Sequence, residues 1–316
     1  MTLFITEEEV EYLLDMRSTL DAVEEILRQQ AEGRATNRPR RRVALRRSML
    51  NVMFAGAPEM GALGLKAYTV SRTGARFYTM LFDPESGELL SILQSDKLGQ
   101  LRTGAASGVA TRHLAREDAN ALGLYGAGWQ AESQLEAIAA VKQLSRVVVY
   151  SSTEESRKGF AEMMGERLRM GIETTNAPEE PAAQDIVVTA TSSKEPVLLG
   201  EWLKPGTHVN AAGSNFLFKS EIDRHVVNRA NLVTIDSRAE LDLEAGSLLQ
   251  SLETGIVIPE AVRELGQVIA GHVPGRRSPE DITLFASQGI PLEDLAAARL
   301  VYDRAVEEGV GREMDF

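Results

Sequence analysis

The spacing of apolar residues predicts two helices at the start of the chain. Thr6 and the three glutamates after it form a capping-box pattern, which opens a short helix that runs through Leu14. Ser18 caps a second helix, and Gly33 stops it. Apolar residues three or four positions apart mark the buried face of this second helix: Leu20, Val23, Ile26 and Leu27.

Short apolar or alternating runs follow, and this pattern is typical of strands. A turn at residues 83–87, with the sequence Asp-Pro-Glu-Ser-Gly, joins the last two runs. An Ala-, Gly- and Leu-rich segment from Asp96 to Leu114 then predicts a tightly packed helix that leaves the first domain. We expect an α+β region with hairpins, whose strands lie at residues 49–54, 63–70, 77–82 and 89–93.

From residue 119 onward, strand patterns alternate with helix patterns. This alternation predicts α/β architecture with a Rossmann-type, doubly wound parallel sheet. We expect strands at residues 121–125, 146–150, 185–189, 207–211, 232–235 and 282–285, and helices at residues 130–141 and 154–169. Residues 292–308 form a final amphipathic helix that returns to the first domain. The predicted layout is a dinucleotide-binding domain at residues 117–290 and a discontinuous α+β substrate-binding and dimerisation domain at residues 1–116 and 291–316.

Composition narrows the class of protein. The chain has 316 residues, too many for one comfortable core, which favours two domains. Its net charge of −12 argues against nucleic acid as a partner. Cysteine is absent, which excludes disulfides and thiolate chemistry. No apolar run is long enough to span a membrane, and the acidic N-terminus is unlike a signal peptide, so we expect a cytoplasmic protein.

One short stretch departs from this acidity. A basic patch of this kind is compatible with a nucleic-acid contact. A hairpin whose arginines bind small carboxylates, or simply face solvent, fits the overall acidity better. The arginines are Arg38, Arg40, Arg41, Arg42, Arg46 and Arg47.

A glycine-rich turn carries the clearest chemical signal. Residues 126–131 fit the pattern G-x-G-x-x-A, directly after a predicted buried strand and at the start of a predicted helix. Gly126 permits the tight turn, Gly128 lets a pyrophosphate approach the backbone, and Ala131 lets the helix pack close to the strand. The helix N-terminus offers N–H groups to the phosphates. The turn therefore predicts a nicotinamide dinucleotide, with Ala127, Trp129 and Gln130 completing the binding segment.

The end of the next strand bears on the choice between NAD and NADP. Ser151, Ser152 and Thr153 follow Tyr150, where an acid would bind the ribose 2′-hydroxyl of NAD. Arg157 and Lys158 lie one turn further on. Small hydroxyls with nearby bases favour NADP as the coenzyme, but the pattern does not exclude NAD. Equally, the two bases could be a solvated helix face, and Glu154 and Glu155 could supply a late acid.

Several segments together resemble the ornithine cyclodeaminase/mu-crystallin family. They are Gly-Leu-Lys-Ala-Tyr at residues 64–68, Leu-Arg-Thr-Gly-Ala-Ala-Ser at 101–107, the turn at 126–131, Asn-Ala-Ala-Gly-Ser-Asn at 210–215 and Thr-Leu-Phe-Ala-Ser-Gln-Gly at 283–289. The resemblance implies a dinucleotide-binding domain and a dimerising substrate domain, hence a homodimer. Its members deaminate ornithine with bound NAD, reduce cyclic ketimines or imino acids with NADPH or NADH, or interconvert alanine and pyruvate.

The resemblance assigns roles to three basic residues and a threonine. Lys66 lies among apolar neighbours, where desolvation would lower its pKa and suit it to proton transfer; a solvent-facing strand lysine is the alternative. By resemblance, Lys66 contacts the substrate carboxylate or donates a proton. Arg102, in the Ala-rich helix, holds the substrate carboxylate, unless it forms an internal ion pair. Thr103 reaches the coenzyme. Arg40 matches the family's Pro-Arg element, and Arg42, on the same strand face, is the reserve.

Two asparagines depart from the cyclodeaminase branch of the family. Asn51 and Asn215 stand where that branch carries acids that grip and deprotonate a substrate amine. Asparagine forms hydrogen bonds but is neither a base nor a counter-ion. We therefore count Asn51 and Asn215 as substrate-binding candidates and expect a reductase rather than a lyase.

The remaining expected coenzyme contacts lie at the carboxyl ends of the later strands. They are Thr189, Ala190, Thr191, Gly213, Ser214 and Ser287. The four histidines form no paired motif, so no metal site is expected. The sequence thus predicts an NAD(P)H-dependent reductase of small ketimines or imino acids, or an alanine-type dehydrogenase. The alternatives are an ornithine cyclodeaminase with bound NAD and a non-catalytic ligand-binding protein.

Overall fold

The computed structural model describes residues 2–315, and the chain divides into two compact units. Unit 1 comprises Met1–Arg102 and Gly289–Phe316, and unit 2 comprises Thr103–Gln288. The divisions fall at residues 102/103 and 288/289, whereas the sequence patterns suggested 116/117 and 290/291. The helix α3 (Asp96–Leu114) contributes its first residues to unit 1 and the rest to unit 2.

Two helices begin unit 1. Helix α1 (Glu7–Leu13) follows Thr6, whose backbone N–H donates to Glu9 Oε2 at 2.7 Å, so the predicted capping box is confirmed. Helix α2 (Met16–Ala31) begins earlier than predicted. Its cap is Asp15, which accepts a hydrogen bond from the Ser18 N–H at 3.0 Å. Ser18 as the cap was wrong, because Asp15, three residues before it, caps the helix by binding the N–H of Ser18 itself.

The strands of unit 1 form one mixed sheet. Over residues 2–315 its order is β15-β1-β6-β5-β4-β3-β2. Strand β1 pairs with β6 in parallel, and the other neighbours are antiparallel. The predicted hairpin strands are confirmed, whereas β1 and β15 are too short to show a hydrophobic pattern. The bounds are β1 (Thr2–Ile5), β2 (Thr36–Ala44), β3 (Ser48–Ala57), β4 (Ala62–Ser71), β5 (Gly74–Phe82), β6 (Leu89–Gln94) and β15 (Arg312–Met314), with a 3₁₀ turn η1 at Pro58–Met60.

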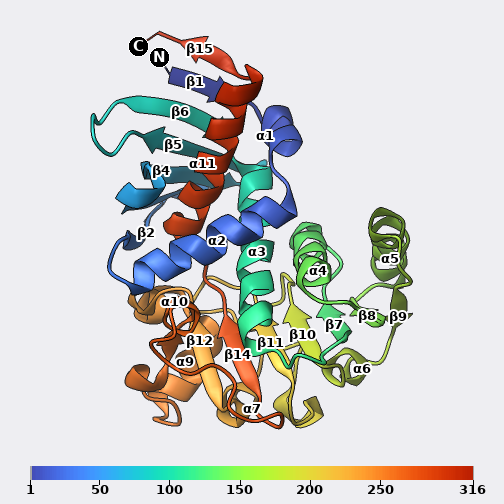
Figure 1. Ribbon diagram of the computed structural model, residues 1–316. Helices are drawn as coiled ribbons and strands as arrows, with labels where there is room; N and C mark the ends of the chain where they lie inside the picture. Colours follow the sequence, from blue (N-terminus) through green and yellow to red (C-terminus); the bar gives the residue numbers. More distant parts are fainter. Residues whose placement is uncertain (1, 316) are drawn as a thin grey trace. The chain divides into compact units, whose positions relative to one another are not determined.

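Helix α11 (Pro291–Glu308) covers one face of this sheet. It packs against β3, β4, β5 and α2, and Figure 1 shows it in red across the strands. Side chains on β3 and β4 alternate between this covered face and the opposite one. Met53 and Lys66, which are register partners, both lie on the covered face and are buried. The opposite face exposes apolar side chains, among them Phe54 and Leu63.

Unit 2 is built on a parallel sheet. Over the described residues its order is β13-β12-β14-β11-β10-β7-β8-β9, with parallel pairing throughout. The chain runs outward from β7 to β9, returns to β10 beside β7, and continues on the other side through β11, β12 and β13, with β14 inserted between β11 and β12. This reversal makes the β7–β10 pair the switch point of the sheet. The bounds are β7 (Ala121–Tyr125), β8 (Arg146–Tyr150), β9 (Glu173–Thr175), β10 (Ile186–Thr189), β11 (His208–Ala211), β12 (Leu232–Ile235), β13 (Arg263–Glu264) and β14 (Thr283–Ala286).

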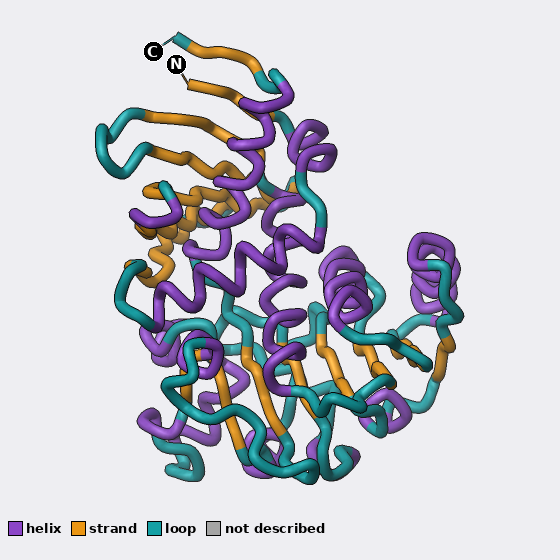
Figure 2. Tube along the Cα trace, in the orientation of Figure 1, coloured by secondary structure: helices purple, strands orange, loops and turns teal. Residues whose placement is uncertain are grey.

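Both faces of the parallel sheet are buried, as a doubly wound fold requires. Leu122 and Val188 belong to the core beneath α4 and α5, whereas Val187 and Val209 belong to a second core with α7. Figure 2 shows helices on both sides of these strands. The predicted α/β, doubly wound fold is confirmed. The helices are α4 (Trp129–Val141), α5 (Glu154–Leu168), α6 (Glu179–Ala182), α7 (Arg224–Arg229), α8 (Leu241–Glu244), α9 (Gly246–Glu253) and α10 (Leu265–Ile269), with 3₁₀ turns at Gly200–Trp202, Arg238–Glu240 and Pro259–Ala261.

The helices are those of a packed globular fold. Within residues 2–315, none combines the length and the apolar character that a bilayer span requires.

Candidate active site

Four charged side chains form a buried cluster inside unit 1. Lys66 Nζ donates to Asp294 Oδ1 at 2.7 Å. Arg102 donates from Nε to the same oxygen at 3.0 Å and from Nη1 to Glu293 Oε2 at 2.7 Å. Lys66 and Arg102 are only 3% and 6% exposed, and both acids are fully buried. Lys66 and Arg102, predicted from two separate motifs, are thus joined through two acids on α11.

A third cation belongs to the same cluster. Arg40, 5% exposed on β2, donates from Nη2 to the carbonyl oxygen of Gly289 at 3.1 Å and lies against the sulfur of Met53. Its guanidinium carbon lies 5.8 Å from the centre of the Tyr68 ring. We call Arg40, Lys66, Arg102, Glu293 and Asp294 the charge cluster.

Local sequence explains how these side chains meet. The period-two alternation of β4 turns Lys66 toward α11, and Gly99 on α3 leaves room for it, because a side chain there would lie 2.8 Å from Lys66 Nζ. Pro291 starts α11, so Glu293 and Asp294 occupy its first turn. Acids in that turn interact favourably with the positive end of the helix dipole. The bulge in β2 between Arg38 and Arg41 lies at Arg40.

The cluster has an uneven charge balance. Three cations face two anions, so the five groups carry one formal positive charge in excess. Burial lowers the pKa of Lys66, and the neighbouring Arg102 and Arg40 lower it further, whereas Asp294 opposes them. Burial would raise the pKa of Asp294, but Arg102 and Lys66 outweigh it and lower that pKa. Asp294 is therefore a carboxylate that favours the charged form of Lys66.

Sequence reasoning missed Glu293 and Asp294. It treated residues 292–308 as an amphipathic helix, in which acids near the start are ordinary partners of the helix dipole. The only available signal was a pair of adjacent acids directly after the proline that opens a helix, and this pattern is common on solvent-facing helices. Their burial depends on packing against β4 and α3, which sequence spacing does not reveal.

Two further substrate candidates are not among the residues of the charge cluster. Asn51 on β3 is fully buried and its Oδ1 accepts a hydrogen bond from Arg42 Nε at 3.2 Å. Arg42, the reserve for Arg40, is thus engaged with Asn51, its register partner. Asn215 lies in unit 2, in the loop after β11.

The glycine turn of unit 2 has the geometry that its motif predicts. Gly126 adopts φ of +114°, which side-chain-bearing residues rarely adopt, and any side chain there would collide with the carbonyl oxygen of Ala190. Its N–H donates to the Tyr150 carbonyl at 2.9 Å. Gly128 is the N-cap of α4, and Ala131 is fully buried against the sheet. Trp129 is half-exposed at the first position of α4, followed by Gln130.

The other predicted coenzyme residues lie at the same edge of the parallel sheet. Tyr125, Thr189 and Ala211 are level with one another in the pairing register. Ala190 and Thr191 follow β10, Gly213 and Ser214 follow β11, and Ser287 follows β14. In parallel α/β sheets the carboxyl edge is where ligands bind.

The turn leaves space for a dinucleotide. A side chain built at Gly128 would meet no atom within 4 Å, so a phosphate can approach the backbone at the N-terminus of α4. Gln134 Nε2 donates to the Thr103 carbonyl at 3.2 Å and ties α4 to α3. The residues present fit a nicotinamide dinucleotide with its pyrophosphate at residues 126–131.

The end of β8 distinguishes the two predicted bases. Arg157 Nη1 donates to the Ser151 carbonyl at 3.3 Å, which holds the guanidinium beside the strand end. Lys158 instead pairs with Glu154 at 2.6 Å along exposed helix α5. Thr153 caps α5 by accepting a hydrogen bond from the Ser156 N–H, and Ser152 is exposed beside it. Of the two predicted bases, Arg157 is therefore the one that lies beside the end of β8.

His208 is structural. It is fully buried at the first residue of β11, the amino end, and its Nδ1 lies 2.9 Å from Thr283 Oγ1. Burial lowers its pKa to about 3, so it is neutral at physiological pH. In residues 2–315 no group of three or more His, Asp or Glu side chains is arranged to hold a metal ion.

Comparison with known proteins adds homology to this geometry. A Delta(1)-pyrroline-2-carboxylate reductase of Bacillus thuringiensis is 38% identical over 84% of each chain. The solved Delta(1)-pyrroline-2-carboxylate reductase of Thermococcus litoralis, in complex with NADH and L-proline, superposes with a TM-score of 0.93 at 30% identity, covering 99% of this chain and 100% of the other. An archaeal alanine dehydrogenase dimer with bound NAD gives 0.94 at 33% identity, covering 100% and 99%.

These relatives are oxidoreductases that act on imino or amino acids with a nicotinamide coenzyme. The model of the ornithine cyclodeaminase/mu-crystallin family matches residues 1–309. The match spans both units and therefore includes the charge cluster and the glycine turn alike. The chain belongs to the ornithine cyclodeaminase/mu-crystallin family.

Proposed function

We propose that this chain is an NADP(H)-preferring reductase of small cyclic ketimines or other 2-imino acids, or an amino-acid dehydrogenase of the alanine type. The observation that carries the proposal is the charge cluster, with three buried cations and two buried acids that pair with Lys66 and Arg102. Alanine and pyrroline-2-carboxylate, which the relatives' names mention, both carry a carboxylate beside the reacting carbon. A carboxylate neutralises the one positive charge in excess.

Arg102 is the proposed anchor of the substrate carboxylate. Its guanidinium is fixed by Glu293 and Asp294, so it loses little side-chain freedom when a ligand binds. A rigid planar fork suits a carboxylate, and burial strengthens the attraction. Arg40 adds a second fixed cation. Because these two cations would hold the one charged group of the substrate, every substrate molecule would bind in the same orientation.

Lys66 is the proposed proton donor. Reduction of an imine requires a proton on nitrogen as well as a hydride on carbon. Burial lowers the pKa of Lys66 toward the range where proton transfer is efficient, while Asp294 keeps the ammonium charged and aimed. In the dehydrogenase direction the same amine would accept the proton.

The coenzyme, when bound, supplies or accepts the hydride at the substrate α-carbon. Residues 126–131 would hold its pyrophosphate through main-chain N–H groups. Thr103, Ala190, Thr191, Gly213, Ser214 and Ser287 would line the remainder. Positioning and electrostatics on these fixed elements carry most of the rate.

The preference for NADP rests on the end of β8. Ser151, Ser152 and Thr153 put no carboxylate where a 2′-phosphate would sit, and Arg157 lies beside Ser151. The solved relatives contain NAD or NADH, so the proposed preference is a property of these residues in this chain.

An ornithine cyclodeaminase fits this chain less well. Asn51 and Asn215 offer hydrogen bonds but no negative charge to a substrate amine. Asn51 already accepts from Arg42, which leaves it poorly placed to receive an ammonium group.

We also propose a homodimer through the open face of the unit 1 sheet. Phe54, Leu63 and Tyr78 are each more than a third exposed there, and Phe54 and Leu63 line an apolar hollow of about 660 Å³. Monomers rarely expose such patches without a partner. The archaeal alanine dehydrogenase was solved as a dimer. Phe54→Glu should shift sedimentation from dimer to monomer; a dimer unchanged by this variant would refute the interface.

A spectrophotometric screen tests the function. NADPH and NADH are offered with pyrroline-2-carboxylate, piperideine-2-carboxylate, pyruvate plus ammonium, and ornithine, while absorbance at 340 nm and released ammonia are followed. The proposal predicts coenzyme oxidation with at least one imino acid and faster rates with NADPH. Ammonia from ornithine at constant absorbance would identify a lyase instead. Coenzyme binding with no turnover on any substrate would indicate a binding protein.

A further inference from the structure

A carboxylate with an unusual set of partners lies buried in unit 2. Glu221, 1% exposed in the segment between β11 and α7, accepts four hydrogen bonds. Its Oε1 accepts from the Thr191 N–H at 2.5 Å and the Thr191 hydroxyl at 2.6 Å. Its Oε2 accepts from the Gly213 N–H at 2.6 Å and the Thr189 hydroxyl at 3.1 Å. The side chain therefore joins the loops that follow β10 and β11.

All four donors are neutral. In the described part of the chain Glu221 has no ion-pair partner, so the buried charge is stabilised by N–H and O–H dipoles alone. Burial raises the pKa of Glu221, and the bonds from Thr191, Gly213 and Thr189 oppose that rise. Burying a carboxylate has a large desolvation cost, which a segment needed only for packing would avoid with an apolar residue.

The two loops lie at the switch point of the sheet. Strand β10 is the neighbour of β7 where the direction of winding reverses, and dinucleotides bind in the crevice there. The loop after β10 also contacts the phosphate turn. Gly126 lies so close to the Ala190 carbonyl that it leaves no room for a side chain. Gly213 is equally constrained, since a side chain there would collide with the Glu221 carboxylate. Glu221, Thr191, Ala190 and Gly126 thus form one continuous line of contacts.

We propose that Glu221 is a positioning residue for the coenzyme: it fixes the loops after β10 and β11 in the shape that receives the nicotinamide half. The first mononucleotide half of such a sheet, β7 to β9, takes the adenosine, which leaves β10 and β11 for the nicotinamide. Both carboxylate oxygens of Glu221 accept hydrogen bonds from these loops, so Glu221 acts on the coenzyme through them. The inference rests on the proposed placement of the coenzyme.

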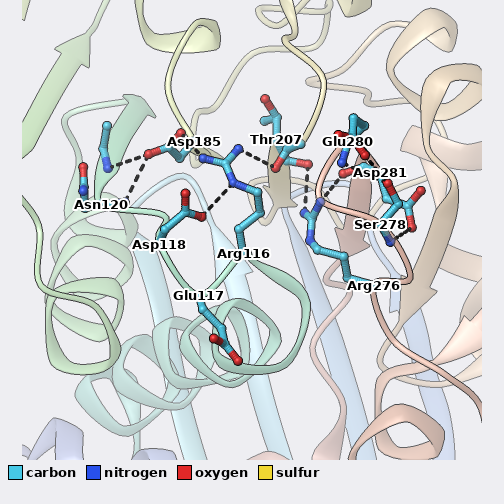
Figure 3. A network of polar contacts seen from close by, with 12 residues as sticks. Arg116, Glu117, Asp118, Asn120, Asp185, Thr207, Arg276, Ser278, Glu280 and Asp281 are labelled. Atoms are coloured by element: carbon cyan, nitrogen blue, oxygen red, sulfur yellow. Dashed lines mark hydrogen bonds and ion pairs between the residues drawn. The ribbon is translucent and has the colours of Figure 1, made fainter.

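The same strand supplies a matched control at its other end. Asp185 precedes β10 and accepts from the N–H groups of Asn120 and Ala121 at 3.1 and 3.2 Å, and from Arg116 Nη2 at 2.9 Å. Figure 3 shows Asp185 between Asn120 and Arg116. Asp185, like Glu221, is a carboxylate that joins backbone amides of neighbouring segments. It does so at the amino edge, where no coenzyme is proposed.

The test compares Glu221→Gln with Asp185→Asn. Fluorescence titrations of NADPH and NADH give the dissociation constants. They are carried out at a temperature below the melting temperature of each variant. We expect Glu221→Gln to weaken the better-bound coenzyme about tenfold or more, because charged hydrogen bonds to two loops are lost. KM for coenzyme should rise while KM for imino acid stays near the wild-type value. Asp185→Asn should lower the melting temperature and leave both coenzyme constants unchanged.

Hydrogen exchange of the coenzyme-free protein provides a second readout. The amides of Thr191 and Gly213 should exchange faster in Glu221→Gln and not in Asp185→Asn. If Glu221→Gln does not fold, Thr189→Val removes one donor at constant shape and should give a smaller loss of affinity in the same direction. Wild-type affinity in Glu221→Gln, or equal losses in both variants, would overturn the inference. Wild-type protein that binds neither coenzyme would instead refute the proposed function.

Discussion

The two units bury polar groups in opposite ways. In the charge cluster of unit 1, Asp294 pairs with Lys66 and Arg102 through one carboxylate oxygen, and Glu293 pairs with Arg102. At the carboxyl edge of unit 2, the buried carboxylate of Glu221 is satisfied by neutral donors, and the glycine turn offers main-chain N–H groups. An excess of positive side-chain charge suits the binding of a substrate carboxylate and the donation of a proton. Fixed main-chain dipoles suit the binding of a coenzyme phosphate that is released between turnovers. Substrate chemistry and coenzyme binding should therefore fail separately.

Removing the lysine of the charge cluster should have the largest effect. Lys66→Ala is expected to lower kcat about a hundredfold or more, the size associated with loss of a general acid. Coenzyme dissociation constants should not change, because Lys66 takes no part in the unit 2 edge. Lys204→Ala, at an exposed position, is the control and should behave as wild type. Wild-type turnover in Lys66→Ala would remove Lys66 from the mechanism.

Filling the open space at the phosphate turn should affect coenzyme binding. Gly128→Ala adds a methyl group where the structure has no neighbouring atom, at φ −107° and ψ −176°, which alanine tolerates. Stability should change by no more than about 0.5 kcal/mol, as for an ordinary surface substitution.

Coenzyme affinity should nevertheless fall about tenfold or more in Gly128→Ala, equivalent to ~1.4 kcal/mol, because the methyl group occupies the place of the pyrophosphate. Gly159→Ala, also in open space but within α5, is the control and should bind coenzyme normally. Calorimetric titration distinguishes the two. Undiminished affinity in Gly128→Ala would mean that the phosphates bind elsewhere.

Substitutions of the adjacent acids of α11 test how the charge cluster sets the pKa of Lys66. Asp294→Asn removes the group that raises the pKa of Lys66, and burial, Arg102 and Arg40 remain to lower it. In the proposed reduction the protonated lysine is the active form, so activity should be lost as pH rises through the pKa of Lys66. The alkaline limb of kcat should therefore move to lower pH in Asp294→Asn.

Glu293→Gln is the matched control for that shift. Glu293 binds Arg102, whereas Asp294 binds both Arg102 and Lys66, and the two acids are equally buried. Both variants should be less stable by about 3 kcal/mol, as expected for breaking a buried ion pair. Only Asp294→Asn should shift the pH profile. An identical shift in both variants would show that the effect comes from general disruption of the charge cluster.

The smallest effect should be confined to one coenzyme. Arg157→Ala is expected to raise KM for NADPH about tenfold, the size of a lost charged hydrogen bond, and to leave KM for NADH unchanged. Lys158→Ala should change neither constant, because Lys158 pairs with Glu154 on the helix surface. Equal effects of Arg157→Ala on both coenzymes would argue against a 2′-phosphate contact.

Much of the fold was predictable because its signals are local. Alternation on β3 to β6, the strand–glycine–helix sequence at β7 and α4, and the capping box at Thr6 each depend on residues close in the chain. The confirmed elements are of this kind. The erroneous cap at Ser18 arose because two capping residues, Asp15 and Ser18, stand three positions apart, and spacing alone favours neither.

The candidate sites were predictable only in part, for the same reason. Lys66 and Arg102 stand in recognisable segments, but their partners Glu293 and Asp294 lie about two hundred residues away in the chain. Glu221 is a single acid in an irregular segment without periodicity. What makes these three acids functional candidates is burial and convergence, which arise from long-range packing and leave no pattern in the sequence.

A crystal structure with NADPH and L-proline, the product of pyrroline-2-carboxylate reduction, would show whether the charge cluster binds the substrate carboxylate. We expect the proline carboxylate to lie within hydrogen-bonding distance of Arg102, with Lys66 still held by Asp294. A well-defined proline whose carboxylate contacts none of Arg40, Lys66 and Arg102 would contradict this expectation.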